Sequence, residues 1–350
     1  MERQSNLKIG INIQSPKNNF VKEILRRAQL NNIDISEDVD TYSDNLRLKL
    51  LYISPQKGFI RPCPCSKKYR CCGYFTIDTI EGCIFECEYC ILRSFIDSSK
   101  ILIKADVDEM LSELNQFTSS LSKKGLRVRI GTGELSDSLA LEHIIPFAPI
   151  LIETTKNTDK VILEFKTKSD NVEEILELPH HPLTTISFSM TSTYLHQRLE
   201  IGTSSPTQRL LAAKRCTAHS YRVGFHFDPI IYYRDYVQDY EMIIRELASL
   251  IPLDAISWIS LGTIRFNPIM LDKFTSDLLF GEYIMDKEKK MRYPLRLRIR
   301  MYKTILDLLR TYLGDKIKVY LCMELDMVNE LILGKKFENN YVLSKYITNV

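Results

Sequence analysis

The chain has 350 residues, of which 45% are hydrophobic and 26% are charged. This length predicts roughly two domains or one large α/β barrel, with a core that needs no disulfides. The low glycine and proline contents, 13 residues each, exclude collagen-like and low-complexity chains. The net charge of +3 is too small to indicate nucleic-acid binding by itself.

Segments rich in β-branched and aromatic residues alternate with segments of helical periodicity. We predict strands at 74–79, 127–131, 161–166, 185–190, 221–227 and 255–261, with a later strand at 318–323. We predict helices at 107–121, 139–153, 172–176, 207–218 and 238–250. This alternation predicts an α/β fold with a parallel sheet, as a partial or full barrel or a doubly wound sheet. We then expect the active site at the carboxyl ends of the strands.

The segments that flank this body are predicted to be additions to it. We expect an N-terminal extension over residues 1–70, the barrel over 71–270, and a C-terminal extension over 271–350 that is a candidate for substrate contact.

Hydrophobic runs are short throughout the chain. No stretch approaches the roughly 20 apolar residues of a membrane span, and the first residues lack the apolar run of a signal peptide. We therefore expect a cytoplasmic protein without membrane contact. Cytoplasmic thiols stay reduced, and most of the nine cysteines lie between Cys63 and Cys90. This clustering favours metal or redox chemistry over a disulfide framework.

The segment 82–90 carries the most informative motif. Its sequence is GCIFECEYC, so Cys83, Cys87 and Cys90 have a C-x3-C-x2-C spacing directly after the first predicted barrel strand. Three thiolates bind three irons of a [4Fe–4S] cluster and leave the fourth iron open for a small molecule. The alternative is structural zinc, with a fourth ligand from the upstream cysteines. These are Cys63, Cys65, Cys71 and Cys72.

This motif, with Tyr89 before its last cysteine, resembles that of the radical S-adenosylmethionine (SAM) enzymes. The resemblance implies a [4Fe–4S] cluster whose open iron binds SAM and whose reduced form cleaves it to methionine and a 5′-deoxyadenosyl radical. It also implies a partial (β/α)6 barrel with N- and C-terminal extensions. An electron donor such as a flavodoxin or a ferredoxin is an implied partner.

Further blocks resemble one group of these enzymes, the spore photoproduct lyases. Besides GCIFECEYCIL they are GELSDSLALEHI and the segments 199–204, 209–213, 223–225, 228–231 and 264–266. They run in order from about residue 70 to 305. The resemblance implies a carbon–carbon lyase whose radical attacks a UV-induced thymine dimer in DNA, after which the bridge between the bases breaks.

The same resemblance makes seven residues candidates for cofactor binding. The glycine-rich end of the second strand resembles the segment that contacts the methionine moiety, and a carboxylate there suits its ammonium group. The candidates are Tyr89, Gly133, Glu134, Ser136, Asp137, Lys168 and Ser189. For Ser136 and Asp137 the alternative is the start of a helix with an acidic first turn.

Two positions depart from the family pattern. The best-known members carry a cysteine that returns a hydrogen atom to the product, and Glu134 occupies its aligned position here. They also carry a tyrosine directly after the last cluster cysteine, where this chain has Ile91. If this chain repairs the lesion, we expect Cys71 or Cys72 to be the hydrogen donor, because both directly precede the first strand.

These departures keep two alternatives open. One is the same radical chemistry on another substrate, such as a different base, a peptide or a metabolite. The other is a metal-bearing nucleic-acid-binding module without catalysis.

A basic segment with interleaved tyrosines, residues 291–303, is the candidate region for DNA contact. Arg296, Arg298 and Arg300 alternate, so an extended backbone would place them on one face. Arginines bind phosphates, and aromatic rings suit an extruded base. The candidate DNA contacts are Arg265, Arg292, Tyr293, Arg296 and Arg298. The alternative is a solvated surface.

Overall fold

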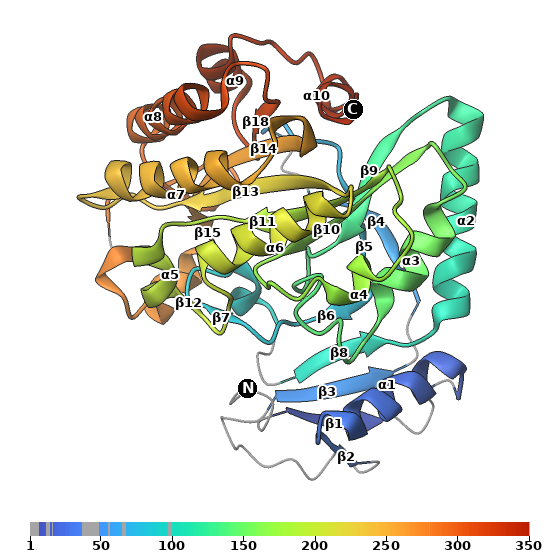
Figure 1. The fold of residues 1–350 in the computed structure, drawn as a ribbon. Helices are drawn as coiled ribbons and strands as arrows, with labels where there is room; N and C mark the ends of the chain where they lie inside the picture. Colours follow the sequence, from blue (N-terminus) through green and yellow to red (C-terminus); the bar gives the residue numbers. More distant parts are fainter. Residues whose placement is uncertain are drawn as a thin grey trace.

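The computed structural model describes residues 7–11, 15, 17–36, 49–54, 57–64, 68–96, 100–279 and 281–349. An eight-stranded sheet curls into a half barrel, and helices cover its outer face (Figure 1). The strand order is β18-β14-β13-β11-β10-β9-β5-β4, and only the β4–β5 pair is antiparallel. The strands are β4 (Ile60–Pro62), β5 (Phe75–Ile77), β9 (Val128–Thr132), β10 (Val161–Thr167), β11 (Thr184–Ser189), β13 (Arg222–Ile230), β14 (Ile256–Thr263) and β18 (Val319–Leu321).

The predicted α/β partial barrel is confirmed, and each of the seven predicted strands ends within three residues of an observed one. The connecting helices are α2 (Val107–Lys124), α3 (Phe147–Thr155), α4 (Glu173–Leu176), α5 (Thr193–Leu199), α6 (Pro206–Ala218) and α7 (Tyr236–Leu250). The prediction of a helix from residue 139 was wrong at its start, because residues 139–146 form turns and α3 begins after Pro146. Helix α5 was not predicted.

The two faces of the curled sheet differ in chemistry, and this difference positions the site. On the outer face, apolar side chains such as Phe165, Phe188 and Phe225 are fully buried in the main hydrophobic core. On the inner face, strand alternation presents polar side chains. They include Arg129, Glu164, Lys166, Ser187 and His226.

A second sheet packs beside the half barrel, with helix α1 (Asn19–Leu30) against it (Figure 1). Its order is β2-β1-β3-β8-β6. The strands are β1 (Leu7–Ile11), β2 (Asp34–Ser36), β3 (Lys49–Ser54), β8 (Lys100–Lys104) and β6 (Ile80–Glu81). The segment 60–104 therefore contributes strands to both sheets.

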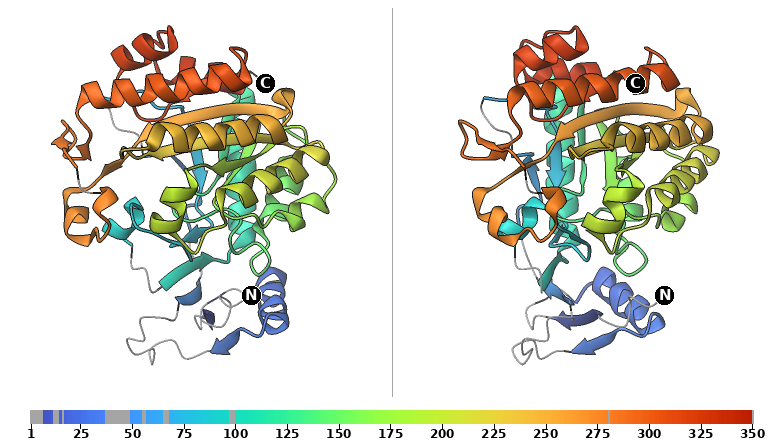
Figure 2. Two further views of the ribbon diagram at one scale, coloured as in Figure 1. Left: turned by 60° about the vertical axis from the view of Figure 1, so that its left-hand side comes forward. Right: turned by 90° about the vertical axis from the view of Figure 1, so that its left-hand side faces the viewer.

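The C-terminal part covers the β18 end of the half barrel with three helices, α8 (Leu295–Leu313), α9 (Asp326–Leu333) and α10 (Asn340–Thr348). Before α8, a segment of short elements lies at the carboxyl ends of the barrel strands (Figure 2). These elements are β15 (Arg265–Phe266), η4 (Pro268–Lys273), η5 (Asp277–Leu279), β16 (Ile284–Met285) and β17 (Met291–Arg292). In the described part of the chain, no helix has the length and apolar character needed to cross a membrane.

Candidate active site

The three motif cysteines lie on one loop at the carboxyl end of the half barrel, between β6 and the short helix η2 (Ile91–Ser94). Cys87 is buried, Cys83 and Cys90 are partly buried, and no described cysteine forms a disulfide. Burial raises the pKa of all three thiols, that of Cys83 to about 12. Such thiols keep their protons until a bound metal displaces them.

The three thiols match the ligand set of an iron–sulfur cluster in which protein thiolates hold three of the four irons. Within the described ranges, no three His, Cys, Asp or Glu side chains are placed to hold a single metal ion. Cys72, a proposed fourth zinc ligand, instead accepts a hydrogen bond from Arg129 on the inner face of the barrel. Cys65 lies outside the described residues.

The cysteine loop is held by segments that are distant in the sequence. Its strand β7 (Glu86–Cys87) pairs antiparallel with β12 (Glu200–Ile201). The carboxylate of Glu88 accepts the backbone N–H groups of Thr275 and Ser276. The ammonium group of Lys273 donates to the carbonyl of Arg93 at 2.6 Å. These contacts fix the loop on two sides.

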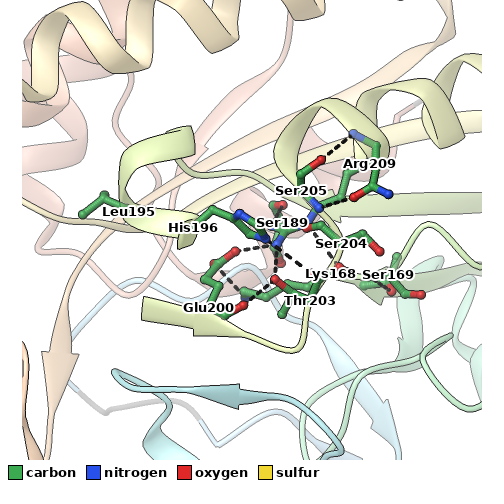
Figure 3. Close-up of polar contacts among 12 residues, drawn as sticks. Lys168, Ser169, Ser189, Leu195, His196, Glu200, Thr203, Ser204, Ser205 and Arg209 are labelled. Atoms are coloured by element: carbon green, nitrogen blue, oxygen red, sulfur yellow. Dashed lines mark hydrogen bonds and ion pairs between the residues drawn. The ribbon is translucent and has the colours of Figure 1, made fainter. Parts of the chain in front are cut away.

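A buried carboxylate, Glu200, connects the cysteine loop to the strand ends. Figure 3 shows Glu200 beside Lys168 and Thr203. Tyr89 donates its hydroxyl hydrogen to one oxygen, and the Nη2 atom of Arg209 lies 2.5 Å from the other. The Nζ atom of Lys168 lies 3.9 Å from Glu200 and 5.7 Å from the Tyr89 ring centroid. Burial alone would raise the pKa of Glu200, but Arg209 and Lys168 lower it overall. Glu200 is therefore an anion at neutral pH.

The guanidinium of Arg209 ties together the ends of two strands and the loop before α6 (Figure 3). Its Nη1 atom donates to the carbonyl of Ser189 at 2.7 Å, and its Nε atom donates to the carbonyls of Lys168 and Ser204. Its Nη2 atom also donates to the hydroxyl of Thr203 at 2.8 Å. This arrangement holds Lys168 and Ser189, both predicted cofactor residues, beside the cysteine loop.

The loop after the second barrel strand lies against the cysteine loop, because Gly82 donates its N–H to the carbonyl of Leu135 at 2.9 Å. Gly133 has φ +95°, and a Cβ atom there would lie 2.7 Å from the hydroxyl of Ser138. The backbone conformation and the packing against Ser138 therefore require glycine at this position, independently of any ligand. Glu134 is partly buried, with a carboxylate oxygen 3.9 Å from the Nζ atom of Lys166.

The structure gives Asp137 a clear part in shaping this loop. One oxygen accepts the N–H groups of Leu139 and Ala140 and the hydroxyl of Thr167, and the other accepts the N–H of Lys168. The alternative reading, in which Asp137 caps the following turns, therefore describes its contacts, although no regular helix starts there. Ser136 lines the same loop and stays a predicted cofactor residue.

The two predicted hydrogen donors, Cys71 and Cys72, have different surroundings. Cys71 is buried beside α10, and its backbone N–H donates to Asn340 at 3.0 Å. Cys72 accepts a hydrogen bond from the Nη2 atom of Arg129 at 2.9 Å. Hydrogen bonding from Cys71 and the charge of Arg129 lower the pKa of Cys72. A thiolate has no S–H hydrogen to give, so this environment argues against Cys72 as the donor.

The inner face of the barrel holds a polar network that we did not predict. Glu164 accepts hydrogen bonds from Ser187, His226 and Trp258 and lies 3.4 Å from the Nε atom of Arg129. Burial would raise the pKa of Glu164, but Arg129 and His226 lower it overall. One signal was present in the sequence, since a glutamate stands in the middle of the apolar strand VILEFKT.

Arg296, Arg298 and Arg300 lie in the first turns of α8, so the extended backbone that would place all three on one face is not present. The apolar positions of this segment recur at helical spacing, and Arg298 falls among them on the buried side. Its guanidinium pairs with Glu324 at 3.0 Å. Arg298 is therefore not available for a DNA contact in this structure.

The other predicted DNA contacts divide between buried and exposed positions. Arg292 is 2% exposed and pairs with Asp286, and Tyr293 is 3% exposed, so neither presents a free surface. Arg265 is partly buried and pairs with both oxygens of Asp228. Arg296 alone among the five candidates is exposed.

Comparisons with known proteins agree with this geometry. A family described as "Spore photoproduct lyase" matches residues 27–287. The spore photoproduct lyases of Geobacillus sp. and Bacillus subtilis are 28% and 25% identical over 175 and 181 residues. These matches cover 50% and 51% of this chain and only about half of each relative, 51% and 52%.

Solved structures of spore photoproduct lyases share the fold. A mutant enzyme with dinucleoside spore photoproduct has a TM-score of 0.76 to this chain, and another with bound AdoMet and the same dinucleoside has 0.75. Both are 19% identical and cover 90% of this chain, which spans 98% and 97% of theirs.

Proposed function

Because the chain belongs to the spore photoproduct lyase family, we propose that it is a radical SAM enzyme that repairs a UV-induced thymine dimer in DNA. The observation that carries this proposal is the cysteine loop, which presents one buried and two partly buried thiols in C-x3-C-x2-C spacing at the carboxyl end of a half barrel. Glu200 and Glu88 hold that loop from two sides. The reaction is a carbon–carbon bond cleavage.

In this proposal some residues of the chain hold the cluster, and others orient SAM. In this proposal Cys83, Cys87 and Cys90 hold three irons of a [4Fe–4S] cluster. The chemistry that the cluster supplies when bound is reductive cleavage of SAM to methionine and a 5′-deoxyadenosyl radical, which removes hydrogen from the lesion. We assign Lys168 to the SAM carboxylate and Glu134 to its ammonium group, since both lie on loops that contact the cysteine loop.

Three further assignments complete the proposal. The substrate is DNA, as the name of the family implies. The electron donor is a small redox protein such as a flavodoxin or a ferredoxin. The site of action is the cytoplasm, where DNA and such donors meet.

One observation favours a second candidate, the same radical chemistry on another substrate. Glu134 pairs with Lys166 at the position where the best-known family members carry a hydrogen-donating cysteine. A carboxylate cannot return a hydrogen atom to a thymine radical. A substrate that needs no such return would fit this site equally well.

The test is anaerobic reconstitution of the full chain with iron and sulfide, followed by assay with SAM, a strong reductant and dinucleoside spore photoproduct. We expect 5′-deoxyadenosine and free thymidine, and we expect Cys83→Ala to abolish both products and the iron–sulfur absorption. Cys216→Ala is the matched control, because Cys216 is a buried cysteine of helix α6, outside the cysteine loop.

The outcomes separate the candidates. Deoxyadenosine without lesion reversal supports the second candidate. A loaded cluster that never cleaves SAM contradicts both.

A further inference from the structure

Two arginines and three tyrosines lie along the carboxyl end of the sheet outside the cysteine loop. The Arg198 guanidinium lies 3.8 Å from the Tyr194 ring centroid, and Tyr194 stacks on Tyr233 at 5.1 Å. The next residue, Tyr232, has the Arg300 guanidinium 5.6 Å from its ring centroid. We call these five residues the Arg–Tyr row. Helix α5, the loop after β13 and helix α8 each contribute to it.

The row ends at a hollow of about 790 Å³. This volume lies within the range of roughly 300–1,000 Å³ that is typical of ligand sites. Tyr232, Arg296 and Arg300 line it together with the edge of the largely buried Tyr293, and Asp277 and Glu282 also border it. The hollow therefore offers aromatic faces, guanidinium groups and carboxylates to one ligand.

The cations of the hollow are free to bind an external anion. Arg296 and Arg300 are exposed, and within the described ranges neither forms an ion pair with a carboxylate. Arg298, between them in the sequence, points to the core and pairs with Glu324. Helix α8 therefore buries Arg298, whereas Arg296 and Arg300 face the hollow.

The aromatic platform is held in place before any ligand arrives. The Tyr233 hydroxyl contacts Ser192 at 2.8 Å and donates to Asp239 at 2.7 Å. The backbone N–H of Tyr232 donates to the Tyr293 hydroxyl at 3.1 Å. The rings stay accessible nonetheless, since Tyr232 is 41% exposed and Tyr194 is 37% exposed. Such pre-organisation reduces the entropy that a ligand must lose on binding.

These features match the chemistry of an unstacked nucleotide. A base stacks on a tyrosine ring, a phosphate binds arginine, and the amino groups of a base donate to carboxylates. An apolar ligand would form no polar contact with the four charged groups of the hollow.

We infer that the Arg–Tyr row and its hollow bind an unpaired nucleotide that flanks the lesion on the same DNA strand. The inference rests on the proposed function and adds to it a second contact on the strand, outside the position of the reacting bases. The row runs from α5, whose last residue adjoins β12 and the cysteine loop, to α8. It therefore provides a path for a strand that leaves the half barrel.

The test compares two ligands on the reconstituted full chain, an oligothymidylate of about 12 nucleotides and the dinucleoside lesion, which has no flanking nucleotide. We expect Tyr232→Ala to weaken oligothymidylate binding by about 5- to 150-fold, the range for loss of one base–aromatic stack. We expect Arg300→Gln to flatten the salt dependence of that binding by about 0.7 in logarithmic slope. Arg310→Gln, on the same helix but paired with Asp315, is the matched control.

The ratio of the two affinities decides the inference. A fall in oligothymidylate affinity relative to that of the dinucleoside supports it. Equal losses for both ligands would identify the hollow as the lesion site and overturn it, and so would unchanged binding of both. If the substitutions instead impair electron transfer from a flavodoxin, the surface binds a protein and the inference is wrong.

Lesion reversal is measured separately in the same samples. A wild-type chain that binds oligothymidylate through these residues but reverses no lesion contradicts the proposed function alone. A chain that reverses the lesion while both variants bind oligothymidylate normally contradicts only the inference.

Discussion

Two buried carboxylates, Glu200 and Glu164, each face a buried arginine, yet the two pairs are built differently. Around Glu200, all three nitrogen atoms of Arg209 donate hydrogen bonds. Around Glu164, the Nε and Nη1 atoms of Arg129 have no hydrogen-bond partner among the described residues. The charge of Arg129 is instead surrounded by aromatic rings. They belong to Tyr74, Trp258 and Tyr320, at 4.8 to 5.2 Å.

The Glu200 pair is therefore a fixed support, whereas the Arg129 pair lies in an interior that can adapt. Saturated hydrogen bonding gives the Glu200 pair one geometry, and that geometry positions the cysteine loop. The Arg129 pair lies on the inner face of the half barrel and keeps polar atoms that can still bond to a partner. We therefore expect substitutions at the first pair to act on folding and cluster retention, and those at the second to act more weakly on stability.

The largest effect is expected at Arg209. Arg209→Ala leaves the buried Glu200 charge without its main partner, so we expect a loss of about 3–5 kcal/mol in the free energy of unfolding. Urea denaturation measures this loss, and iron content after reconstitution should fall with it. Arg215→Ala on the same helix removes an exposed ion pair to Glu173 and should cost only about 0–1 kcal/mol. Similar losses for both variants would remove the distinction between the two kinds of arginine.

A smaller effect is expected at the inner-face pair. Glu164→Gln keeps the oxygen that accepts from Ser187, His226 and Trp258, so we expect a loss of about 1–3 kcal/mol. The matched variant Glu200→Gln should cost more, since Arg209 and Lys168 both lose their counter-charge. If urea denaturation shows a larger loss for Glu164→Gln than for Glu200→Gln, the Glu164 network contributes more to the free energy of unfolding than the Glu200 network.

The smallest effect concerns pH. The pKa of Glu200 is lower in the folded chain than in the unfolded chain, so its ion pair contributes stability above the unfolded pKa of about 4.3. That contribution is lost as the pH falls through the folded pKa. Glu200→Gln should therefore flatten the decline in unfolding free energy below about pH 4.5. A decline as steep as that of the wild type would show that Glu200 does not titrate in this range.

Sequence patterns were sufficient for the half barrel. Strand 161–166 and its neighbours were found because buried parallel strands require runs of β-branched and aromatic residues. Cys83, Cys87 and Cys90 were proposed as metal ligands because their spacing lies within one loop, and the structure places all three on that loop. The N-terminal sheet was missed, since β6 and β8 are short and depend on pairing with a strand from another part of the chain.

Arginines were the least predictable residues of the site. Arg298 and Arg296 are two positions apart in the sequence, but helix geometry buries one and exposes the other. Glu200 and Arg209 lie in a segment that resembles the family, yet their part in holding the cysteine loop depends on the pairing of β7 with β12. Local patterns cannot reveal which distant carboxylate an arginine meets, because that is decided by tertiary packing.

The contact between Glu88 and the backbone of Thr275 and Ser276 sets an order for the maturation of the chain. The two partners are 187 and 188 residues apart, so the loop that carries the cysteines is synthesised long before the segment that closes over it. Contacts of such long range form late in folding, because a large loop must first be closed. The native conformation of the cysteine loop therefore requires that Ser276 has been synthesised, and a ribosome-bound nascent chain that ends before it lacks this contact.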